Sequence, residues 1–315
     1  MLSSKLPFRQ WGNCIMQPGK MPSRPAAAAG SFYSGNGIAL RRDIERYMKA
    51  GHDLLLRRAA CLAERFHQPQ ERPSASLSPS MVLLPHAGYM YSGAAACAAL
   101  DGITLPERLI ILGPTHTGRG RNFGIWPGGT WQTPLGELPV DLPLLHELTG
   151  RGVFAPDVQC HLGEHAIEVL LPFLRTVAPA CSILPVTVAF PQNPEVLVQA
   201  ARVLGELLLA HTDADGLCDV GLIISSDMNH FANEEKTQEL DEAALRCVLD
   251  MDAEALLRVV ADRHISMCGV LPAAVGLMAC RVAGISHAHL CAHETSAEVS
   301  GNYQRVVGYA SLLFW

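Results

Sequence analysis

From residue 81 onward, short apolar runs alternate with longer stretches whose apolar residues recur at helical spacing. The short runs are rich in β-branched residues and predict strands over 81–85, 108–114, 182–190, 220–226, 287–294 and 305–314. The longer stretches predict helices over 92–102, 167–177, 196–211, 237–250, 252–263 and 271–284. Nearly continuous apolar strands are typical of a sheet that is buried on both faces. The pattern therefore predicts an α/β fold of one domain, with a mostly parallel central sheet covered by helices on both faces.

The chain before residue 81 does not follow this alternation. Residues 1–24 are polar and predict a flexible N-terminal tail, so that the domain itself spans 25–315. Residues 38–66 place apolar side chains at helical spacing with arginines on the opposite face, which predicts one or two helices. Residues 67–80 are rich in proline and serine and predict an insertion or linker inside the domain.

Three predicted strands are followed directly by a histidine. His86 comes after the strand at 81–85 and His116 after the strand at 108–114, while Asp227 and His230 follow the strand at 220–226. In an open α/β sheet, ligands bind beyond the carboxyl ends of the strands. A single histidine at such a place is more often a helix cap or a hydrogen-bonded core residue. Its repetition at three strand ends favours a common site, although Asp227 is also a good helix N-cap.

Two further segments carry candidate chemistry. Cys268 precedes a helix whose start is marked by Pro272, and the field at a helix start favours the thiolate form, which binds metals. A buried structural thiol fits this position equally well. His165 and Glu168 are spaced i, i+3 and share a helical face with Glu164. That face either supports the site from behind with a carboxylate or is an ordinary solvated first turn.

A third cluster of histidines lies near the C-terminus. His287, His289 and His293 fall on one face of the predicted strand at 287–294, with a spacing that would suit a metal. The segment does not lead from a strand into a helix, however, and an edge strand with solvent-facing histidines is the preferred interpretation. The glycine-rich stretch at 113–124 lacks the Lys-Ser/Thr of a phosphate-binding loop, and the chain has no GxSxG nucleophile motif.

The composition narrows the class of protein. The chain of 315 residues is 49% hydrophobic and 17% charged, with a net charge of −6, which argues against a nucleic-acid partner. No apolar stretch is long enough to span a membrane, and the first twenty residues have no apolar signal core. The ten cysteines lie mostly in apolar runs and form no CxxC pair. We therefore expect reduced thiols and a cytoplasmic location, without a membrane partner.

Several motifs together resemble the Memo family, which is structurally similar to the class III extradiol ring-cleaving dioxygenases. They run in order over 24–315: RPAAAAGSFY, LLPHAGYMYSG, ILGPTHTG, TWQTPLGELPVD, GEHAIEVLLPFL, ISSDMNHF, CGVLPAAVGL and SGNYQRVVGYASLLF. Those dioxygenases hold Fe(II) with two histidines and a glutamate. The resemblance implies that His86 and His116 are the histidine ligands and that Cys268 stands where the glutamate would be. It also places His230 at the acid/base histidine, with Asp227 beside it.

The cysteine changes what the resemblance implies about function. A thiolate is softer than a carboxylate and favours copper or thiolate-tolerant iron, with zinc as a further option, so catechol cleavage does not carry over. Animal members of the family are regarded as redox or metal-handling proteins that bind phosphotyrosine peptides, and microbial members are named for a radical-enzyme partner.

Two functions stay open at this point. The first is an oxidoreductase, dioxygenase-like, that uses Fe(II) or copper at His86, His116 and Cys268. In it, His230 and Asp227 are catalytic, and His165 and Glu168 support the ligands. The second is a non-catalytic protein that holds a peptide or small molecule in the same cleft.

Overall fold

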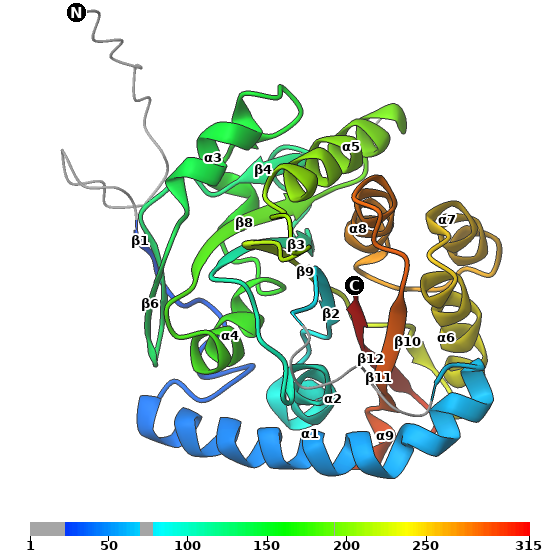
Figure 1. Cartoon of the computed structure of the whole chain (residues 1–315). Helices are drawn as coiled ribbons and strands as arrows, with labels where there is room; N and C mark the ends of the chain where they lie inside the picture. Colours follow the sequence, from blue (N-terminus) through cyan, green and yellow to red (C-terminus); the bar gives the residue numbers. More distant parts are fainter. Residues whose placement is uncertain (1–22, 70–77, 192) are drawn as a thin grey trace, which may run out of the picture.

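A nine-stranded mixed sheet forms the centre of the described chain, which comprises residues 23–69, 78–191 and 193–315 of a computed structural model (Figure 1). Four parallel strands lie in the middle of the sheet: β2 (Met81–Leu84), β9 (Val220–Ser225), β3 (Arg108–Pro114) and β8 (Ser182–Val188). Beyond β2 lie β12 (Val306–Phe314), β11 (Ala288–Thr295) and β10 (His230–Ala232), all in antiparallel pairs. Beyond β8 lie β4 (Phe123–Ile125) and β7 (Ala155–Pro156).

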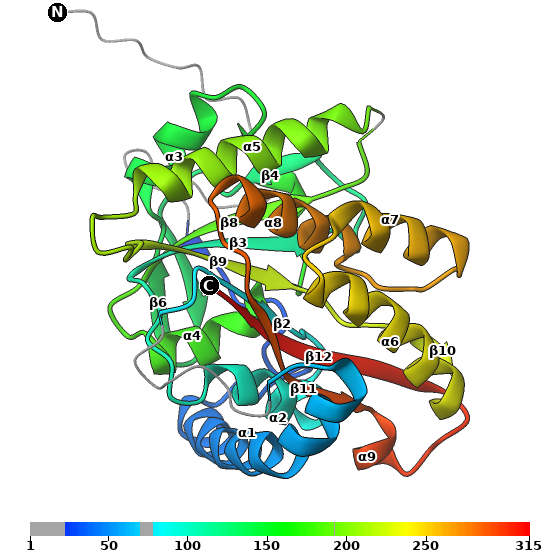
Figure 2. The same ribbon diagram turned by 45° about the vertical axis from the view of Figure 1, so that its right-hand side comes forward.

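Helices cover both faces of this sheet, so that its apolar strands are buried (Figure 2). On one face lie α1 (Gly37–Phe66) and α2 (Tyr89–Leu100), which pack against each other and against β11. On the other face α5 (Glu195–Ala210) packs against α8 (Val270–Val282), and α6 (Glu234–Leu249) and α7 (Ala253–Asp262) follow along the same side. The predicted α/β fold, with a parallel centre and helices on both faces, is confirmed.

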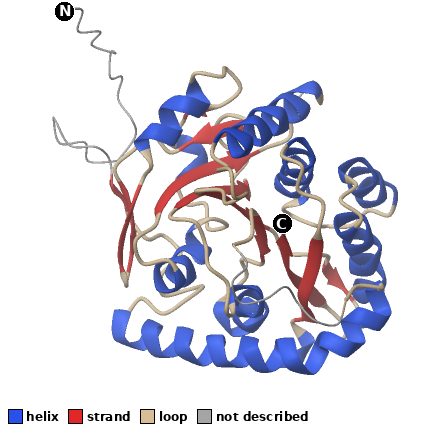
Figure 3. Cartoon of the chain, in the orientation of Figure 1, coloured by secondary structure: helices blue, strands red, loops and turns tan. Residues whose placement is uncertain are grey.

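The region between residues 115 and 178, in which only one helix was predicted, holds several short elements. These are α3 (Leu142–Thr149), the 3₁₀ helices η1 (Gln159–His161) and η2 (Glu168–Leu170), and α4 (Leu171–Val177). A separate small sheet joins β1 (Ser23–Arg24), β5 (Thr130–Thr133) and β6 (Gly136–Pro139) (Figure 3). A last short helix, α9 (Ala297–Ser300), precedes β12. Strands of two to four residues are too short to show a periodic pattern in the sequence.

The segments before residue 81 differ in part from their predictions. Residues 38–66 belong to one helix, α1, which begins after Asn36, whose side chain accepts hydrogen bonds from two backbone N–H groups. Of the predicted tail, residues 1–22 lie outside the described residues, and Ser23 and Arg24 form β1. Residues 70–77 of the predicted insertion also lie outside them. Within the described part of the chain, no helix is both long and apolar enough to cross a membrane.

The histidines of β11 do not face solvent as expected. His289 and His293 are buried, while His287, just before the strand, is exposed. Helices α1, α2 and α6 all contact β11, which explains why an outer strand of the sheet is covered. His293 is moreover hydrogen-bonded to a buried carboxylate, that of Asp241 in α6, at 2.9 Å. The interpretation of these residues as a solvated edge is therefore wrong.

Candidate metal centre

Three imidazoles meet at the carboxyl edge of the parallel strands. His86 follows β2, His116 follows β3, and His165 lies in the turn before η2. One ring nitrogen of each lies within 4.8 Å of those of the other two, and among the described residues this is the one group of three or more His, Cys, Asp or Glu side chains arranged in this way. Nitrogen atoms this close can bind a single transition-metal ion at about 2.0–2.1 Å each after small adjustments. The cluster could therefore hold a metal.

The strands that carry His86 and His116 are not neighbours. Strand β9 lies between β2 and β3 and pairs with both in parallel. The two rings nevertheless approach to 5.3 Å between centroids, because both follow the carboxyl ends of strands on the same edge. Strand β9 ends at Ser225, whose hydroxyl contacts Nδ1 of His86.

His86 is oriented from behind by the hydroxyl of Ser225. That hydroxyl donates its only proton to the carbonyl of Ala166, at 2.6 Å, so it must accept a proton from Nδ1 of His86, at 2.7 Å. The lone pair of His86 is thereby left on Nε2. Burial lowers the pKa of His86 well below its usual value, and the nearby His165 and His116 lower it further. The neutral imidazole that results is the form that binds metals.

His116 is oriented by Glu164. The carboxylate accepts hydrogen bonds from Nδ1 of His116 at 2.8 Å and from its backbone N–H at 2.5 Å. Burial by itself would lower the pKa of His116 and raise that of Glu164. The hydrogen bond between the two side chains and their opposite charges outweigh these effects of burial. The pKa of His116 is therefore raised, and that of Glu164 falls to about 2. Glu164 thus fixes the proton on Nδ1 and leaves Nε2 of His116 free, as carboxylates do behind many metal-binding histidines.

His165 lies between two rings. It stacks on Phe32 and on His116, with 4.5 Å between centroids in both pairs. Burial lowers its pKa, and the proximity of His116 adds to this effect. The sequence analysis assigned His165 a supporting role behind the ligands. In the structure, one of its ring nitrogens lies within 4.8 Å of a ring nitrogen of His86 and of His116. Its position suits a ligand directly.

Glu168 holds the N-terminal segment that carries Phe32. Its carboxylate accepts hydrogen bonds from Arg24 (2.6 Å) and Tyr33 (2.7 Å), and from the backbone N–H groups of Ala27 and Ala28. These contacts keep residues 24–33 beside the cluster. Support of the ligands by Glu168 stays a prediction, and the geometry offers an indirect route through the Phe32–His165 stack.

Cys268 lies beside the cluster at the start of α8. Its Sγ is 3.4 Å from Nε2 of His86 and accepts a hydrogen bond from the N–H of Asp227 at 3.3 Å. Nitrogen and sulfur ligands of one tetrahedral ion are about 3.5 Å apart, so the distance to His86 alone fits a shared metal. Sγ does not lie within 4.8 Å of a ring nitrogen of every histidine in the cluster, so Cys268 would have to shift to join all three. The helix start does not lower the pKa of this thiol. Burial raises it well above the usual value, and the charge of Asp227 raises it further.

His230 and Asp227 flank the same edge. Nδ1 of His230 donates to the carbonyl of Ser266 at 2.8 Å, which leaves Nε2 unprotonated. Asp227 accepts a hydrogen bond from the N–H of His86 at 2.8 Å, and burial raises the pKa of its carboxyl group. Their catalytic roles stay predictions.

Three groups around the cluster escaped the sequence analysis. Glu164 entered it only as a helical neighbour of Glu168, and Ser225 and Phe32 were given no role. For Glu164 the signal was present, since it directly precedes a histidine in GEHAIEV. For Ser225 and Phe32 no local signal exists, because their partners lie 139 and 133 residues away in the chain.

Replacing Glu164 by Gln should weaken metal binding by about 10–100-fold, the usual effect of removing a carboxylate behind a ligating histidine. An amide has one acceptor oxygen, so it cannot serve Nδ1 and the backbone N–H of His116 together. The affinity for Zn²⁺ can be measured by competition with a chelator. Glu195→Gln, on the exposed start of α5, is the matched control. An unchanged affinity in Glu164→Gln would contradict this role.

The buried ring of His161 should make the protein sensitive to acid. Burial lowers its pKa to about 3, with the charge of Arg24 as a second cause, and its Nε2 donates to the carbonyl of Gly124 at 3.1 Å. The unfolded chain takes up a proton at about pH 6.5, and the folded chain does not until about pH 3. The free energy of unfolding should thus fall by about 1.4 kcal/mol for each pH unit across this range. His161→Gln keeps an N–H donor and should make this slope shallower by the contribution of one histidine in denaturant unfolding, while His86, whose pKa burial also lowers, keeps its own contribution. Parallel pH curves for the two proteins would refute it.

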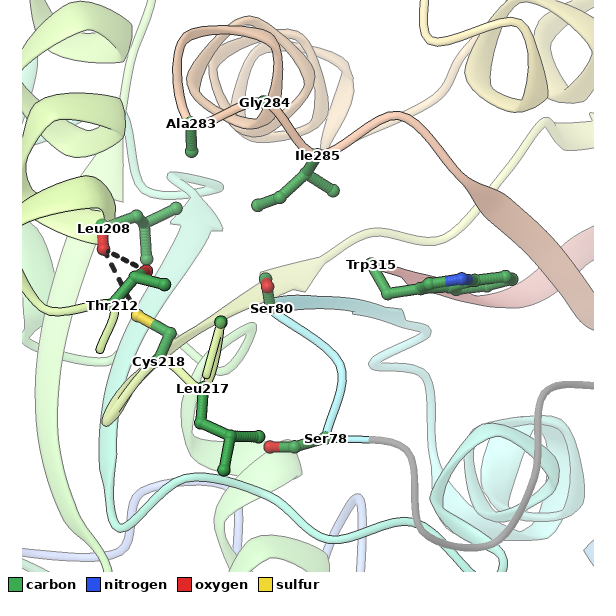
Figure 4. A pocket seen from close by; sticks show the side chains of 11 residues that line it. Ser78, Ser80, Leu208, Thr212, Leu217, Cys218, Ala283, Gly284, Ile285 and Trp315 are labelled. Atoms are coloured by element: carbon green, nitrogen blue, oxygen red, sulfur yellow. Dashed lines mark hydrogen bonds between the residues drawn. The ribbon is translucent and has the colours of Figure 1, made fainter. Parts of the chain in front are cut away.

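A cavity of about 470 Å³ lies at the opposite edge of the sheet (Figure 4). It lies by the amino ends of β2 and β9, since Ser80 and Cys218 precede these strands, and Trp315 closes one side. The hydroxyl of Thr212 and the thiol of Cys218 both donate to the carbonyl of Leu208. These two polar side chains are thus engaged within the protein, and the lining contains no charged side chain. It is separate from the imidazole cluster.

Comparison with known proteins extends over nearly the whole chain. The family model described as "Memo-like protein" matches residues 24–313. A "MEMO1 family protein" of Metallosphaera sedula is 34% identical over 305 residues, covering 93% of this chain and 99% of that protein. Another, of Sulfurisphaera tokodaii, is 34% identical and covers 92% and 99%, respectively. A third, of Aquifex aeolicus, is 35% identical over 243 residues, covering 77% and 88%.

Proposed function

The chain belongs to the Memo family, and from this premise we propose that it is a metal-dependent oxidoreductase acting on a small organic molecule or peptide. The proposal is supported above all by the cluster of His86, His116 and His165. The hydrogen bonds behind His86 and His116 hold a proton on Nδ1 of each ring, so Nε2 is in both the atom that would bind an ion.

We further propose that Cys268 is the fourth donor and that the metal is iron or copper. Three imidazoles also suit zinc, but a thiolate added to them favours copper or thiolate-tolerant iron. A redox-active ion would supply electron transfer between the bound molecule and O₂. The high pKa of the Cys268 thiol in the metal-free protein means that its proton must leave when sulfur binds the ion.

His230 would carry protons in this reaction. Its Nδ1 is held by the carbonyl of Ser266, so only Nε2 can take up or release a proton at the ligand. Asp227 would hold the backbone N–H of His86. Replacing His230 by Ala should therefore preserve metal binding and remove turnover.

A second function, binding of a ligand without catalysis, is favoured by a groove next to His230. It has a volume of about 460 Å³ and is lined by Tyr91, Phe231, Arg305, Tyr309 and four other residues. The ring of Phe231 is exposed and lies under the guanidinium of Arg305, 4.5 Å from the ring centre. Exposed aromatic side chains beside a cleft are typical of binding surfaces for peptides or small molecules.

Metal analysis followed by oxygen uptake separates the two functions. We expect the purified protein to bind about one iron or copper ion per chain. We also expect it to consume O₂ with a catechol or thiol substrate, and His230→Ala to abolish that consumption. In the Co(II)-loaded protein, a sulfur-to-metal absorption band that disappears in Cys268→Ser would support the fourth ligand. Stoichiometric metal without turnover of any substrate would favour the binding function, and absence of metal binding would overturn the proposal.

A further inference from the structure

A chain of hydrogen-bonded polar groups, buried at Asp241, His293 and Asn229 and exposed at Ser266, runs from β11 to His230. At its far end, Nε2 of His293 donates to the carboxylate of Asp241 in α6, at 2.9 Å. Asp241 is completely buried and His293 is 8% exposed. A carboxylate in the interior costs several kcal/mol unless it is well hydrogen-bonded, so such a pair demands an explanation. Neither residue lies in the imidazole cluster.

The same carboxylate holds Asn229, the residue before His230. Its Oδ1 accepts a hydrogen bond from the backbone N–H of Asn229 at 2.8 Å. The side-chain oxygen of Asn229 in turn accepts from the N–H and the hydroxyl of Ser266, at 3.2 and 3.1 Å. Asp241 therefore fixes Asn229, and Asn229 fixes Ser266.

Ser266 contacts His230 at three points. Its hydroxyl accepts from the backbone N–H of His230 at 2.8 Å and lies within donating distance of the carbonyl oxygen of His230, at 3.2 Å. Its own carbonyl accepts from Nδ1 of the ring at 2.8 Å, and because a carbonyl cannot donate, this bond requires the proton on Nδ1. The orientation and tautomer of the His230 ring thus depend on where Ser266 is held.

The backbone is built around this arrangement. The carbonyl of Gly308 in β12 accepts a hydrogen bond from the N–H of Met228, and the N–H of Gly308 donates one to the carbonyl of Asn229, each at 2.9 Å. A Cβ at Gly308 would overlap the carboxylate of Asp241, so glycine is needed there for the close approach. Phe231, directly after His230, has a positive φ of 68°, which is unusual for a side chain of this size and persists only where the surroundings enforce it.

We propose that Asp241, His293 and Asn229 are positioning residues for His230. Through Ser266 they keep the imidazole in the Nδ1–H form, which presents the Nε2 lone pair to a molecule in the cleft. The proposal rests on the proposed function of His230 as the proton carrier. The tautomer itself can nevertheless be observed without any reaction. The inference gives a role to one of the buried histidines of β11 and to a carboxylate that touches neither the cluster nor the groove.

The test is the tautomer of His230 in the full-length protein, read from long-range ¹H–¹⁵N correlations of the imidazole with and without Zn²⁺. His230→Gln assigns the signals. In the wild type we expect the Nδ1–H form. His293→Leu removes the donor to Asp241 and should lower the ratio of Nδ1–H to Nε2–H forms by about fivefold, the effect of one lost hydrogen bond. His293→Gln keeps an N–H donor and should retain the wild-type ratio.

Two further variants keep the test decisive. Ser311→Ala removes a buried hydroxyl of β12 that has no partner within the described residues, and should leave the tautomer unchanged. If His293→Leu does not fold, Asn229→Ala should lower the ratio of Nδ1–H to Nε2–H forms of His230 to a similar extent. Asn229→Asp keeps the acceptor oxygen and should retain the wild-type ratio. A lower melting temperature with the wild-type tautomer in the folded variant would show that the chain only stabilises the fold. Because the readout needs neither turnover nor a bound metal, it can fail or succeed independently of the oxidoreductase function.

Discussion

Replacing His86 by Ala is expected to reduce the affinity for Zn²⁺ or copper by roughly a hundredfold or more. Structural sites with four ligands bind their metal with about 10–16 kcal/mol, so one ligand contributes about 3 kcal/mol. The loss should be large at His86 because one of its ring nitrogens lies within 4.8 Å of those of His116 and His165, and its Nε2 is also 3.4 Å from the sulfur of Cys268. Burial also keeps this ring neutral, which spares it the competition with protons that a histidine ligand normally faces.

A competition titration with a chromogenic chelator measures this affinity, with circular dichroism as a check of the fold. His287→Ala removes an exposed histidine from the start of β11 and is the matched control. We expect His165→Ala to follow His86→Ala, which would place His165 among the ligands. An affinity within about threefold of the wild type for His86→Ala, well below the loss of one ligand, would rule out a metal at this cluster.

Replacing Glu168 by Gln is expected to lower the free energy of unfolding by about 3–5 kcal/mol, the usual cost of breaking a buried ion pair from one side. The pair with Arg24 is almost completely buried, at 2.6 Å. The guanidinium would stay in the interior without its counter-charge, although it also donates to the carbonyls of His161 and Glu164. Its position over the ring of Trp131, 4.1 Å from the centre, would compensate for only a small part.

The comparison with an exposed pair isolates the effect of burial. Arg58 and Glu298 are bonded at 2.8 Å with side chains 40% and 50% exposed, so Glu298→Gln should cost less than about 1 kcal/mol. Unfolding in urea measures both variants. The double variant Arg24→Met, Glu168→Leu should recover most of the stability, because no charge is left buried. If Glu168→Gln lowers the free energy of unfolding by no more than Glu298→Gln does, contacts other than those of Glu168 hold residues 24–33 in place.

The Glu168 variant also bears on the metal centre. Glu168 binds the backbone of Ala27 and Ala28, and the segment that follows places Phe32 on the ring of His165. If this segment loosens, His165 loses the ring that fixes its plane. Metal binding should then weaken in Glu168→Gln even under conditions where the protein remains folded.

Much of the architecture was determined by the sequence itself. Apolar runs of five to nine residues, separated by helical stretches, are local features, and they identified every strand of the parallel centre. A histidine placed directly after such a run must lie at the carboxyl edge of the sheet. His86 and His116 were therefore located by sequence, and the family motifs that contain them cover residues 24–313 of the chain.

The tertiary structure decided which groups act on these histidines. Ser225 lies behind His86 because β9 is inserted between β2 and β3, an order that the periodicity of the strands does not encode. Glu164 rather than Glu168 binds His116, since the turn before η2 directs the two carboxylates to different partners. The pKa of Cys268 is raised rather than lowered, because burial and the neighbouring Asp227 exceed the field of the helix start.

The burial of the histidines in the outer strand β11 could likewise not be predicted from the sequence. The spacing of the histidines in β11 is the same whether the strand faces water or helices, and only the packing of α1, α2 and α6 determines that His293 meets Asp241. Local pattern thus determined the strands of the parallel centre, the longer helices and the edge at which the imidazoles lie, but not the short elements between residues 115 and 178. Hydrogen-bond partners, burial and protonation depend on contacts between residues far apart in the chain, and only the folded structure fixes those.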